Sequence, residues 1–467
     1  MTLIKSISGI RGTIGGEIGM GLTPFDIMKY SAAFGIWVKE NSKNKKVKIV
    51  VGSDARISHE MVNNIVTGTL ISIGIDVINI GMATTPTTEL AVTKTNADAG
   101  IILTASHNPK NWNALKLLNN EGEFLTDVDG KRVLNIAESN DFDFAQVDDL
   151  GKIQNDFSFD DYHINEILEL PLVDVDIIKK ANFKIAFDGI NSVGGIIIPK
   201  LLKALGVNDV IKINCEPTGD FVHTPEPIPE NLTEISKVIR ENNVDLGFVV
   251  DPDVDRLAIV NDDGTMFGEE YTLVAVADYV IGNTKGNTVS NMSSSRALRD
   301  IAKKHGVKYS SSAVGEVNVV DVMKKTNAII GGEGNGGVIY PELHSGRDAL
   351  VGIALFLTYL AKSKKKCSEL RNSYPGYFIS KNKIQLNENI NVDEILNKIE
   401  SIYSKKKADI NTIDGVKIDF EKEWIHLRKS NTEPIIRIYS ESETREKADL
   451  LAQEIIDEIN KIIELGS

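Results

Sequence analysis

The chain has 467 residues, of which 42% are hydrophobic and 25% are charged, and its formal net charge at pH 7 is −14. This composition predicts a soluble globular protein, and the length predicts roughly three or four domains. The acidic balance argues against nucleic acid or an anionic membrane as the main partner. The 2 cysteines form no C-x-x-C pair, and neither a signal peptide nor a long apolar run is present, so we expect a cytoplasmic protein with reduced thiols.

Strand-like and helix-like patterns alternate through most of the chain. Residues 46–54 form a β-branched run, residues 59–74 carry a helical pattern, and residues 75–81 are strand-like again. Strand, helix and strand at this spacing predict a βαβ unit on a buried parallel sheet. The same succession begins again at residues 183 and 286. We therefore expect three related α/β domains.

The pattern changes after residue 370. Amphipathic helices are predicted over 392–404 and 444–463, and two strands joined by a polar turn over 424–442. This combination predicts a smaller α+β domain. The expected domains are 1–155, 156–262, 263–370 and 371–467.

A serine at the end of an apolar run is the first candidate for chemistry. In TASHNP, residues 104–109, Ser106 and His107 precede an Asn-Pro turn. Neighbouring side chains on an extended chain point to opposite sides, which argues against a Ser–His dyad. No G-x-S-x-G elbow of hydrolases surrounds Ser106. By itself the segment is equally consistent with an ordinary turn that has a capping serine.

Three aspartates follow an apolar run in DPDVDR, residues 251–256. Asp251, Asp253 and Asp255 would repel one another unless a cation lies among them, and hard oxygen ligands favour Mg²⁺ over Zn²⁺. The spacing is not that of an EF-hand, because Arg256 occupies the sixth position of the loop. Arg256 instead offers a cation that can hold a phosphate by two hydrogen bonds. The alternative is a solvated acidic turn, which the apolar runs on both sides disfavour.

Two further segments have the composition of ligand-binding loops. GGEGNGG, residues 331–337, lets the backbone approach a ligand, and its Glu333 and Asn335 can bind sugar hydroxyls. Its glycines do not open a helix, which argues against a dinucleotide fingerprint. RKSNTEPIIR, residues 428–437, combines a guanidinium with short polar side chains, as phosphate-binding loops do. Its candidate ligands are Arg428, Ser430, Asn431 and Thr432. A flexible loop and a capping turn are the respective alternatives.

The motifs TASHNP, DPDVDR, GGEGNGG and RKSNTEP follow one another in this order, and SGIRG precedes them at residues 8–12. With these motifs the sequence resembles the α-D-phosphohexomutase superfamily over essentially its whole length. The resemblance implies three α/β domains with mixed sheets and an α+β domain around a central cleft. It also implies that Ser106 is phosphorylated in the resting enzyme and completes the Mg²⁺ site of the three aspartates.

The resemblance assigns roles to further residues of this chain. Arg11 and Arg256 would lie near the phosphoserine, and Lys116 or His107 would act as the general base. Arg437 would support the distal phosphate loop, or would face a carboxylate from its strand.

The implied activity is transfer of a phosphate between the 6- and 1-positions of a hexose. Ser106 would give its phosphoryl group to a hexose monophosphate, and the resulting 1,6-bisphosphate would turn around and return its other phosphate. Glu316 stands where mannose and glucose mutases usually carry a histidine, so that it would face either the amine of glucosamine phosphate or solvent. The sugar loop also departs from the Gly-Glu-x-Ser-Gly-His of many relatives, because it ends in Gly337 and lacks the histidine.

The sequence is therefore most similar to phosphoglucosamine mutases, which make glucosamine 1-phosphate from the 6-phosphate for amino-sugar nucleotide synthesis. A dual phosphomannomutase/phosphoglucomutase is the first alternative. A Mg²⁺-dependent phosphatase that uses Asp251 and Asp253 is another, which Val254 disfavours because a threonine is expected after the second aspartate. A sugar-phosphate-binding protein without activity is disfavoured by the retained catalytic candidates. We expect the last domain to close over the substrate about a hinge at 371–377.

Overall fold

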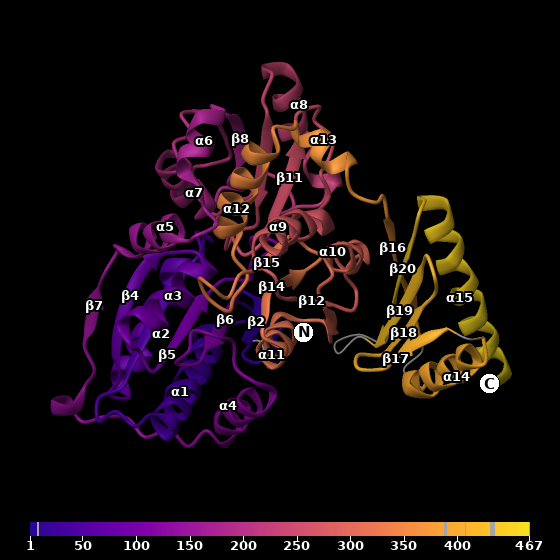
Figure 1. Cartoon of the computed structure of the whole chain (residues 1–467). Coiled ribbons are helices and arrows are strands. Elements are labelled where there is room, and N and C mark those ends of the chain that lie inside the picture. The colour runs from indigo at the N-terminus through magenta and orange to yellow at the C-terminus, as the bar shows by residue number, and fades with distance from the viewer. Residues whose placement is uncertain (7–8, 387–389, 407, 430–434, 467) are drawn as a thin grey trace.

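The computed structural model describes residues 1–6, 9–386, 390–406, 408–429 and 435–466. Four sheets follow one another along the chain, each with its own helices (Figure 1). The predicted architecture of three α/β domains with mixed sheets and a smaller α+β domain is confirmed. None of the described helices is long and apolar enough to cross a membrane.

The first domain is built on one mixed sheet. Its strands are β1 (Ile4–Ser6), β2 (Gly9–Thr13), β3 (Lys48–Ser53), β4 (Asp76–Met82), β5 (Ala99–Leu103), β6 (Trp112–Leu118) and β7 (Ile153–Asn155). Their order in the sheet is β1-β2-β6-β5-β3-β4-β7. The helices are α1 (Pro24–Asn41), α2 (His59–Ser72), α3 (Thr85–Thr95), α4 (Asp127–Ser139) and the 3-10 helix η1 (Val147–Asp149). The predicted βαβ unit is β3–α2–β4, in which the two strands pair in parallel.

The second domain has a four-stranded sheet. Its strands are β8 (Lys184–Asp188), β9 (Asp209–Ile213), β10 (Leu246–Val250) and β11 (Leu257–Asn261). They lie in the order β11-β10-β8-β9. The helices are α5 (Phe159–Glu169), α6 (Val175–Ala181), α7 (Gly194–Ala204), α8 (Thr233–Asn242) and the 3-10 helix η2 (Pro229–Asn231).

The third domain repeats this plan. Its strands are β12 (Asn287–Asn291), β13 (Tyr309–Ser312), β14 (Ala328–Glu333) and β15 (Gly337–Ile339). They lie in the order β13-β12-β14-β15. The helices are α9 (Glu269–Asn283), α10 (Ala297–His305), α11 (Glu316–Thr326), α12 (Ala349–Ser363) and α13 (Cys367–Asn372).

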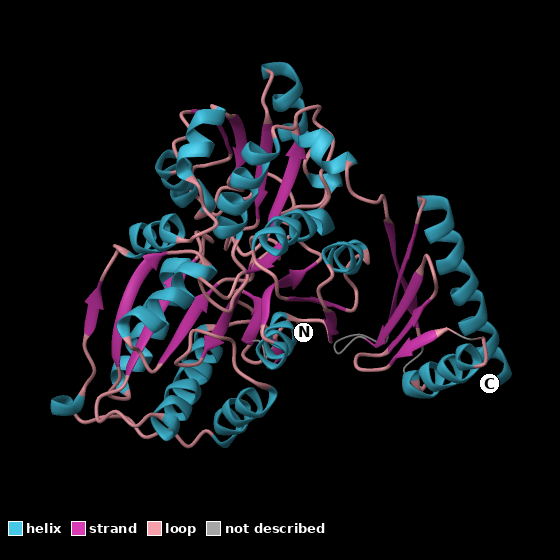
Figure 2. Ribbon diagram, in the orientation of Figure 1, coloured by secondary structure: helices cyan, strands magenta, loops and turns pink. Residues whose placement is uncertain are grey.

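The fourth domain is an antiparallel sheet backed by two helices. Its strands are β16 (Phe378–Gln385), β17 (Asp409–Asn411), β18 (Val416–Asp419), β19 (Trp424–Lys429) and β20 (Ile435–Ser442), and they lie in the order β16-β20-β19-β18-β17. The helices are α14 (Val392–Ser404) and α15 (Arg445–Gly466). Both lie on the outer side of the sheet, so its other face is turned toward the third domain (Figure 2).

Each α/β domain carries an antiparallel hairpin whose turn presents a predicted motif. The turn between β5 and β6 carries Ser106, and the turn between β10 and β11 carries residues 251–256. The turn between β14 and β15 carries Asn335. The same kind of hairpin turn therefore presents a different functional group in each of the three domains.

The apolar core shows how the domains are joined. The second and third domains share one core, in which Phe356 of α12 packs edge-on against Phe248 and Phe267 with ring centroids 6.4 and 5.3 Å apart. The first and fourth domains have cores of their own. The second and third domains are thus one packed unit, to which the first and fourth are attached.

Candidate active site

Ser106 is held on a strained turn directly after β5. Its φ is 47°, a left-handed conformation that is uncommon outside glycine and asparagine. The fully buried Arg56 stabilises this turn, because its guanidinium donates to the Ser106 and Asn108 carbonyls at 2.5 and 2.7 Å and to those of Pro109 and Trp112 at 2.7 and 2.9 Å. Sequence reasoning missed Arg56, since no motif surrounds it.

His107 lies nearer to Ser106 than expected. Its Nδ1 is 3.4 Å from Ser106 Oγ, so the prediction that the two side chains point to opposite sides is wrong. The reason is the left-handed backbone of Ser106, which interrupts the alternation of an extended chain. Burial and the nearby charge of Arg256 lower the pKa of His107 to about 3, so its imidazole is neutral at pH 7.

The three aspartates gather beside the serine. Ser106 Oγ donates a hydrogen bond of 2.7 Å to Asp251 Oδ2. Asp251, Asp253 and Asp255 are fully buried, and each offers a carboxylate oxygen within 4.8 Å of the others. The alternative of a solvated acidic turn is therefore wrong. Burial and the charges of Asp255 and Asp253 raise the pKa of Asp251, which shows how strongly the group disfavours three uncompensated charges.

The remaining oxygens of the triad fit a divalent cation. Asp253 Oδ1 and Asp255 Oδ1 are buried and have no hydrogen-bond partner among the described residues. Asp253 Oδ2 is already bound by Lys116 Nζ and by Thr85 Oγ1, each at 2.7 Å. Unpaired buried carboxylate oxygens are costly unless a cation joins them, and this donor set is the one that Mg²⁺ prefers.

Basic side chains surround the same place. Lys116 Nζ is 2.7 Å from Asp253 and 3.7 Å from Asp255. Burial acts to lower the pKa of Lys116, but these carboxylates outweigh burial and raise the pKa. Lys116 is therefore a cation. Arg256 Nε lies 3.8 Å from Asp251. Arg11 Nε and Arg256 Nε are buried without a hydrogen-bond partner among the described residues. These unused donors can hold phosphate oxygens.

A cleft of about 600 Å³ opens from this site toward the third and fourth domains. A smaller cavity beside Ser106, of about 180 Å³, shares four of its lining residues, so the two are continuous. The acidic side chains of the large cleft are Asp127, Glu316 and Glu333. The basic ones are Arg11, Lys116, Arg256, Arg347, Arg428, Lys429 and Arg437. The excess of basic side chains suits a ligand with phosphates, although the whole chain is acidic.

The fourth domain contributes two arginines to the cleft. Arg428 of β19 and Arg437 of β20 are direct cross-strand partners, and both line the cleft. Arg428 Nε is 2.8 Å from Asp414 Oδ2. Burial and the charge of Arg437 lower the pKa of Arg11, so this domain faces the first across the cleft. Ser430, Asn431 and Thr432 lie outside the described residues, and their role stays a prediction.

The sugar loop reaches the cleft through Glu333 and Asn335. Glu333 is 5% exposed and accepts hydrogen bonds from Asn291 Nδ2 at 2.7 Å and from the Gly315 backbone at 3.0 Å. Burial acts to raise its pKa, but Arg347 outweighs burial and lowers it. Asn335 lines the cleft, and its Oδ1 accepts from the Gly337 backbone at 3.1 Å.

Arg347 is the second residue that sequence reasoning missed. Its Nη2 is 2.6 Å from Asp255, its Nη1 is 2.7 Å from Glu333 and its Nε is 3.0 Å from Glu316. The Arg347 backbone N–H also donates to Glu316, at 3.0 Å. Glu316 is 8% exposed, so the alternative in which it faces solvent is wrong. Both carboxylate oxygens of Glu316 accept hydrogen bonds from Arg347. The hypothesis that Glu316 faces the amine of glucosamine phosphate did not include this pairing.

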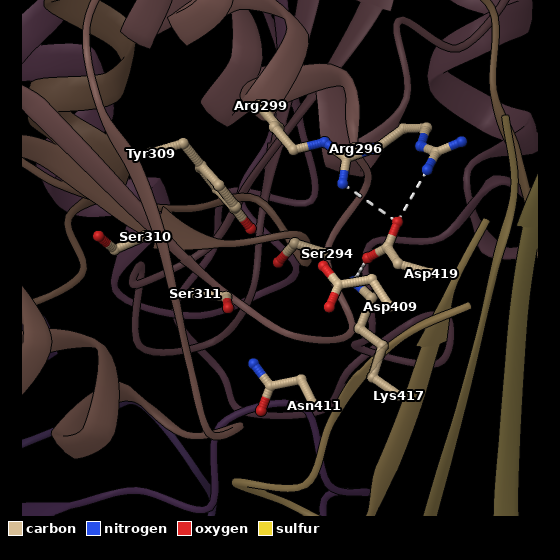
Figure 3. A pocket seen from close by; sticks show the side chains of 10 residues that line it. All are labelled: Ser294, Arg296, Arg299, Tyr309, Ser310, Ser311, Asp409, Asn411, Lys417 and Asp419. Atoms are coloured by element: carbon tan, nitrogen blue, oxygen red, sulfur yellow. Dashed lines mark hydrogen bonds and ion pairs between the residues drawn. The ribbon is translucent and has the colours of Figure 1, made fainter. Parts of the chain in front are cut away.

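A second cavity, of about 380 Å³, lies between the third and fourth domains (Figure 3). Arg296 Nη2 and Arg299 Nη1 donate to the same oxygen of Asp419, at 2.8 and 3.1 Å. Lys417 Nζ donates to the Met292 carbonyl at 2.7 Å. These contacts tie the inner face of the fourth sheet to the third domain.

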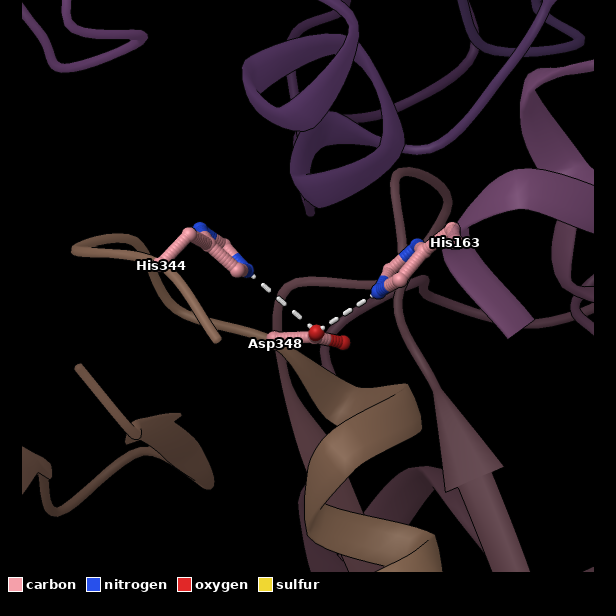
Figure 4. Close-up of side chains that lie close together, drawn as sticks. All are labelled: His163, His344 and Asp348. Carbon is pink, nitrogen blue, oxygen red and sulfur yellow. Dashed lines mark hydrogen bonds and ion pairs between the residues drawn. The ribbon is translucent and has the colours of Figure 1, made fainter. Parts of the chain in front are cut away.

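A buried polar cluster joins the first domain to the other two. His163 Nε2 and His344 Nε2 lie 2.9 and 3.3 Å from Asp348 Oδ2 (Figure 4). His344 Nδ1 lies 3.2 Å from Glu89 Oε2 on α3. Asp348 Oδ2 thus pairs with one nitrogen of each imidazole. The effect of the cluster is to fix α3 and α5 against the start of α12.

Comparison with known proteins decides the family. The four domain families of phosphoglucomutase/phosphomannomutase match in order: α/β/α domains I, II and III over residues 3–144, 161–264 and 268–377, and the C-terminal domain over 385–458. The chain belongs to the phosphoglucomutase/phosphomannomutase family. It is thus a phosphohexomutase of the α-D-phosphohexomutase superfamily, an enzyme that transfers a phosphate within one molecule.

The relatives of this phosphohexomutase are named for different sugar phosphates. A phosphoglucomutase/phosphomannomutase of Thermococcus kodakarensis is 36% identical over 442 residues, 94% of each chain. A phosphoglucosamine/phosphogalactosamine mutase of Sulfurisphaera tokodaii is 32% identical over 461 residues, 98% of each chain. The crystal structure of a Burkholderia thailandensis phosphoglucomutase/phosphomannomutase family protein has the same fold, with a TM-score of 0.83 at 23% identity over 100% of this chain and 99% of that one.

Proposed function

We propose that the enzyme moves the phosphate through a phosphorylated Ser106 and a hexose 1,6-bisphosphate that turns around in the cleft. The observation that carries this proposal is the contact of Ser106 Oγ with the aspartate triad, at 2.7 Å from Asp251. A phosphate on this oxygen can extend into the cavity that Arg11, Lys116 and Arg256 line, beside the aspartate triad. None of the comparisons supports a phosphatase.

The cleft residues have separable tasks in the transfer. Mg²⁺, held by Asp251, Asp253, Asp255 and the phosphoserine, would neutralise the phosphoryl oxygens. Arg11 and Arg256 hold the remaining oxygens, and Lys116 adds a third positive charge. His107 Nδ1, 3.4 Å from Ser106 Oγ and neutral, accepts the hydroxyl proton when the phosphate returns. Phosphoryl transfer depends on such positioning and charge neutralisation more than on covalent help.

The other end of the substrate lies against the third and fourth domains. Glu333 and Asn335 bind sugar hydroxyls, and Arg428, together with Ser430, Asn431 and Thr432, binds the distal phosphate. Arg437 is the cross-strand partner of Arg428 and faces Arg11, so it adds to the positive potential that draws in the second phosphate. Because the bisphosphate has a phosphate at each end, either orientation meets the same pair of anion sites.

We place amino-hexose phosphates first among the substrates. Glu316 and Glu333 put two carboxylates in the wall of the cleft, and a carboxylate oxygen that accepts one hydrogen bond retains a second lone pair for an ammonium. The Sulfurisphaera relative, whose name carries glucosamine and galactosamine, is consistent with this order. Glucose and mannose phosphates come second, supported by the pairing of both Glu316 oxygens with Arg347.

Two measurements test the proposal. Intact mass before and after phosphatase treatment should show the loss of one phosphate together with activity, and Ser106→Ala should show neither phosphate nor turnover, whereas Ser310→Ala in the second cavity should match the wild type. Normal turnover in Ser106→Ala contradicts the mechanism. Values of kcat/KM on glucosamine-, mannose- and glucose-1-phosphate then decide the sugar, and equal values for all three contradict the preference for amino sugars.

A further inference from the structure

We infer that Arg347 is a positioning residue, which fixes the sugar loop against the metal loop and fills the space that a side chain at Gly337 would occupy. This inference rests on the proposed function, because it assigns the two loops their roles. Arg347 stands just before α12, in the third domain, yet its guanidinium contacts carboxylates from three separate segments.

Arg347 occupies the space beside Gly337 in the sugar loop. A Cβ built on Gly337 would lie 2.3 Å from Arg347 Cδ and 3.0 Å from its Cγ, closer than carbon atoms approach. The Gly337 backbone itself does not need a glycine, because its φ is not in the left-handed region. Arg347 is therefore what keeps this position free of a side chain. Where many relatives have a histidine at the end of this loop, this chain supplies a cation from ten residues further on.

Arg347 joins the two loops through hydrogen bonds of its guanidinium. The guanidinium has five N–H donors in a planar fork, and Arg347 uses one on each nitrogen for Glu316, Glu333 and Asp255. Glu333 belongs to the sugar loop and Asp255 to the metal loop, so one rigid group sets the distance between them. Arg347 also lines both the cavity beside Ser106 and the main cleft.

Loss of Arg347 would remove the link between the two loops. Without Arg347, Glu316 and Glu333 lose the guanidinium that pairs with them and joins them to Asp255, and the loops move apart. In phosphoryl transfer a displacement of about 1 Å can lower the rate roughly 10²-fold, so kcat should fall. A lysine keeps the charge but is a point donor without the planar fork, so it cannot hold the three carboxylates in one geometry.

A double-mutant cycle tests the shared space. Gly337→Ala alone should lower kcat/KM about tenfold or more, because Arg347 must leave its place. In the Arg347→Ala background the same change should alter kcat/KM by less than about twofold, because the space is then open. Additive effects overturn the inference. If Arg347→Ala does not fold, Gly337→Ala and Arg347→Lys carry the test, and normal kcat in both overturns it.

Calorimetric titration with Mg²⁺ gives a readout that simple misfolding would not produce. Arg347→Ala removes a positive charge from Asp255, so Mg²⁺ should bind several-fold more tightly while kcat falls. Weaker Mg²⁺ binding together with a lower melting temperature would mean a merely structural role. Arg132→Ala, which removes an exposed arginine paired with Glu40, is the matched control. The proposed function fails separately, through a wild type that carries no phosphoserine.

Discussion

Ser106 Oγ and Asp251 Oδ2 are joined by a hydrogen bond of 2.7 Å, although the two residues are 145 positions apart in the chain. The bond connects the hairpin turn of the first domain to that of the second. Asp253 and Asp255 belong to the same triad as Asp251, and the Oδ1 atom of each has no hydrogen-bond partner among the described residues. Ser106 and the aspartate loop therefore form one unit that joins the first and second domains.

Asp253→Asn should disable the metal site. The change removes a charged ligand oxygen and weakens the salt bridge to Lys116, so Mg²⁺ affinity should fall and kcat should drop by about 10²–10³-fold. Calorimetry with Mg²⁺ and steady-state kinetics measure the two effects. Asp263→Asn, in the exposed turn after β11, should change neither. Undiminished Mg²⁺ binding in Asp253→Asn would contradict the assignment.

Arg56→Met should destabilise the turn that carries Ser106. Four carbonyls lose their donor, and the buried Asp54 loses its salt bridge; removing one partner of a buried ion pair typically reduces stability by about 3–5 kcal/mol. We expect a lower melting temperature, together with a lower rate of Ser106 phosphorylation by glucose 1,6-bisphosphate. Scanning calorimetry and intact-mass kinetics measure these effects. A variant with the melting temperature of the wild type would show that other contacts hold the turn.

The sequence revealed those parts of the site that depend on neighbouring residues. The spacing of Asp251, Asp253 and Asp255 is a local pattern, and one hairpin turn is enough to bring them together. Arg56 and Arg347 act through contacts with residues distant in the chain, and a single arginine carries no pattern that predicts such contacts. The orientation of His107 was predicted wrongly because an extended backbone was assumed, whereas Ser106 has a positive φ that only the surrounding structure maintains.

The cluster around His344 predicts a dependence of stability on pH. Burial acts to lower the pKa of His344, but Asp348 and Glu89 outweigh it and raise the pKa to about 10, against about 6.5 in an unfolded chain. A raised folded pKa stabilises the protein fully below the unfolded value, and this contribution is lost as the pH rises toward the folded value. His344→Gln should therefore lower the melting temperature most at pH 6 and progressively less toward pH 10. A difference that grows with pH would contradict this account.

Asp419→Asn tests the attachment of the fourth domain. The change leaves Arg296 and Arg299 without their carboxylate partner. The fourth sheet is then held to the third domain by fewer contacts, such as that of Lys417 with the Met292 carbonyl. We expect KM for hexose phosphates to rise about tenfold, because the two hydrogen bonds that Arg296 and Arg299 donate to Asp419 lose their charge assistance. At saturating glucose 1,6-bisphosphate the rate of Ser106 phosphorylation should be unchanged, since Ser106 and the aspartate triad lie outside the fourth domain. Asp409→Asn, which lines the same cavity, is the control.

Closure about residues 371–377 remains a prediction, and the structure gives it a specific anchor. Tyr271 Oη donates to the Pro375 carbonyl at 2.6 Å and accepts from the Tyr377 backbone at 2.9 Å, so the segment before β16 is pinned to α9. Small-angle X-ray scattering should show a smaller radius of gyration with glucose 1,6-bisphosphate than without it. In Tyr271→Phe the fourth domain of the free enzyme should adopt a wider range of positions. An unchanged radius in the wild type would contradict closure.

The transfer of a radioactive phosphate tests the central claim most directly. Enzyme labelled with ³²P on Ser106 is mixed with unlabelled hexose 1-phosphate and Mg²⁺, and the products are separated within one turnover. The account predicts that the label leaves the protein and appears in a hexose bisphosphate. Label that appears first in inorganic phosphate, or that stays on the protein while product forms, would contradict it.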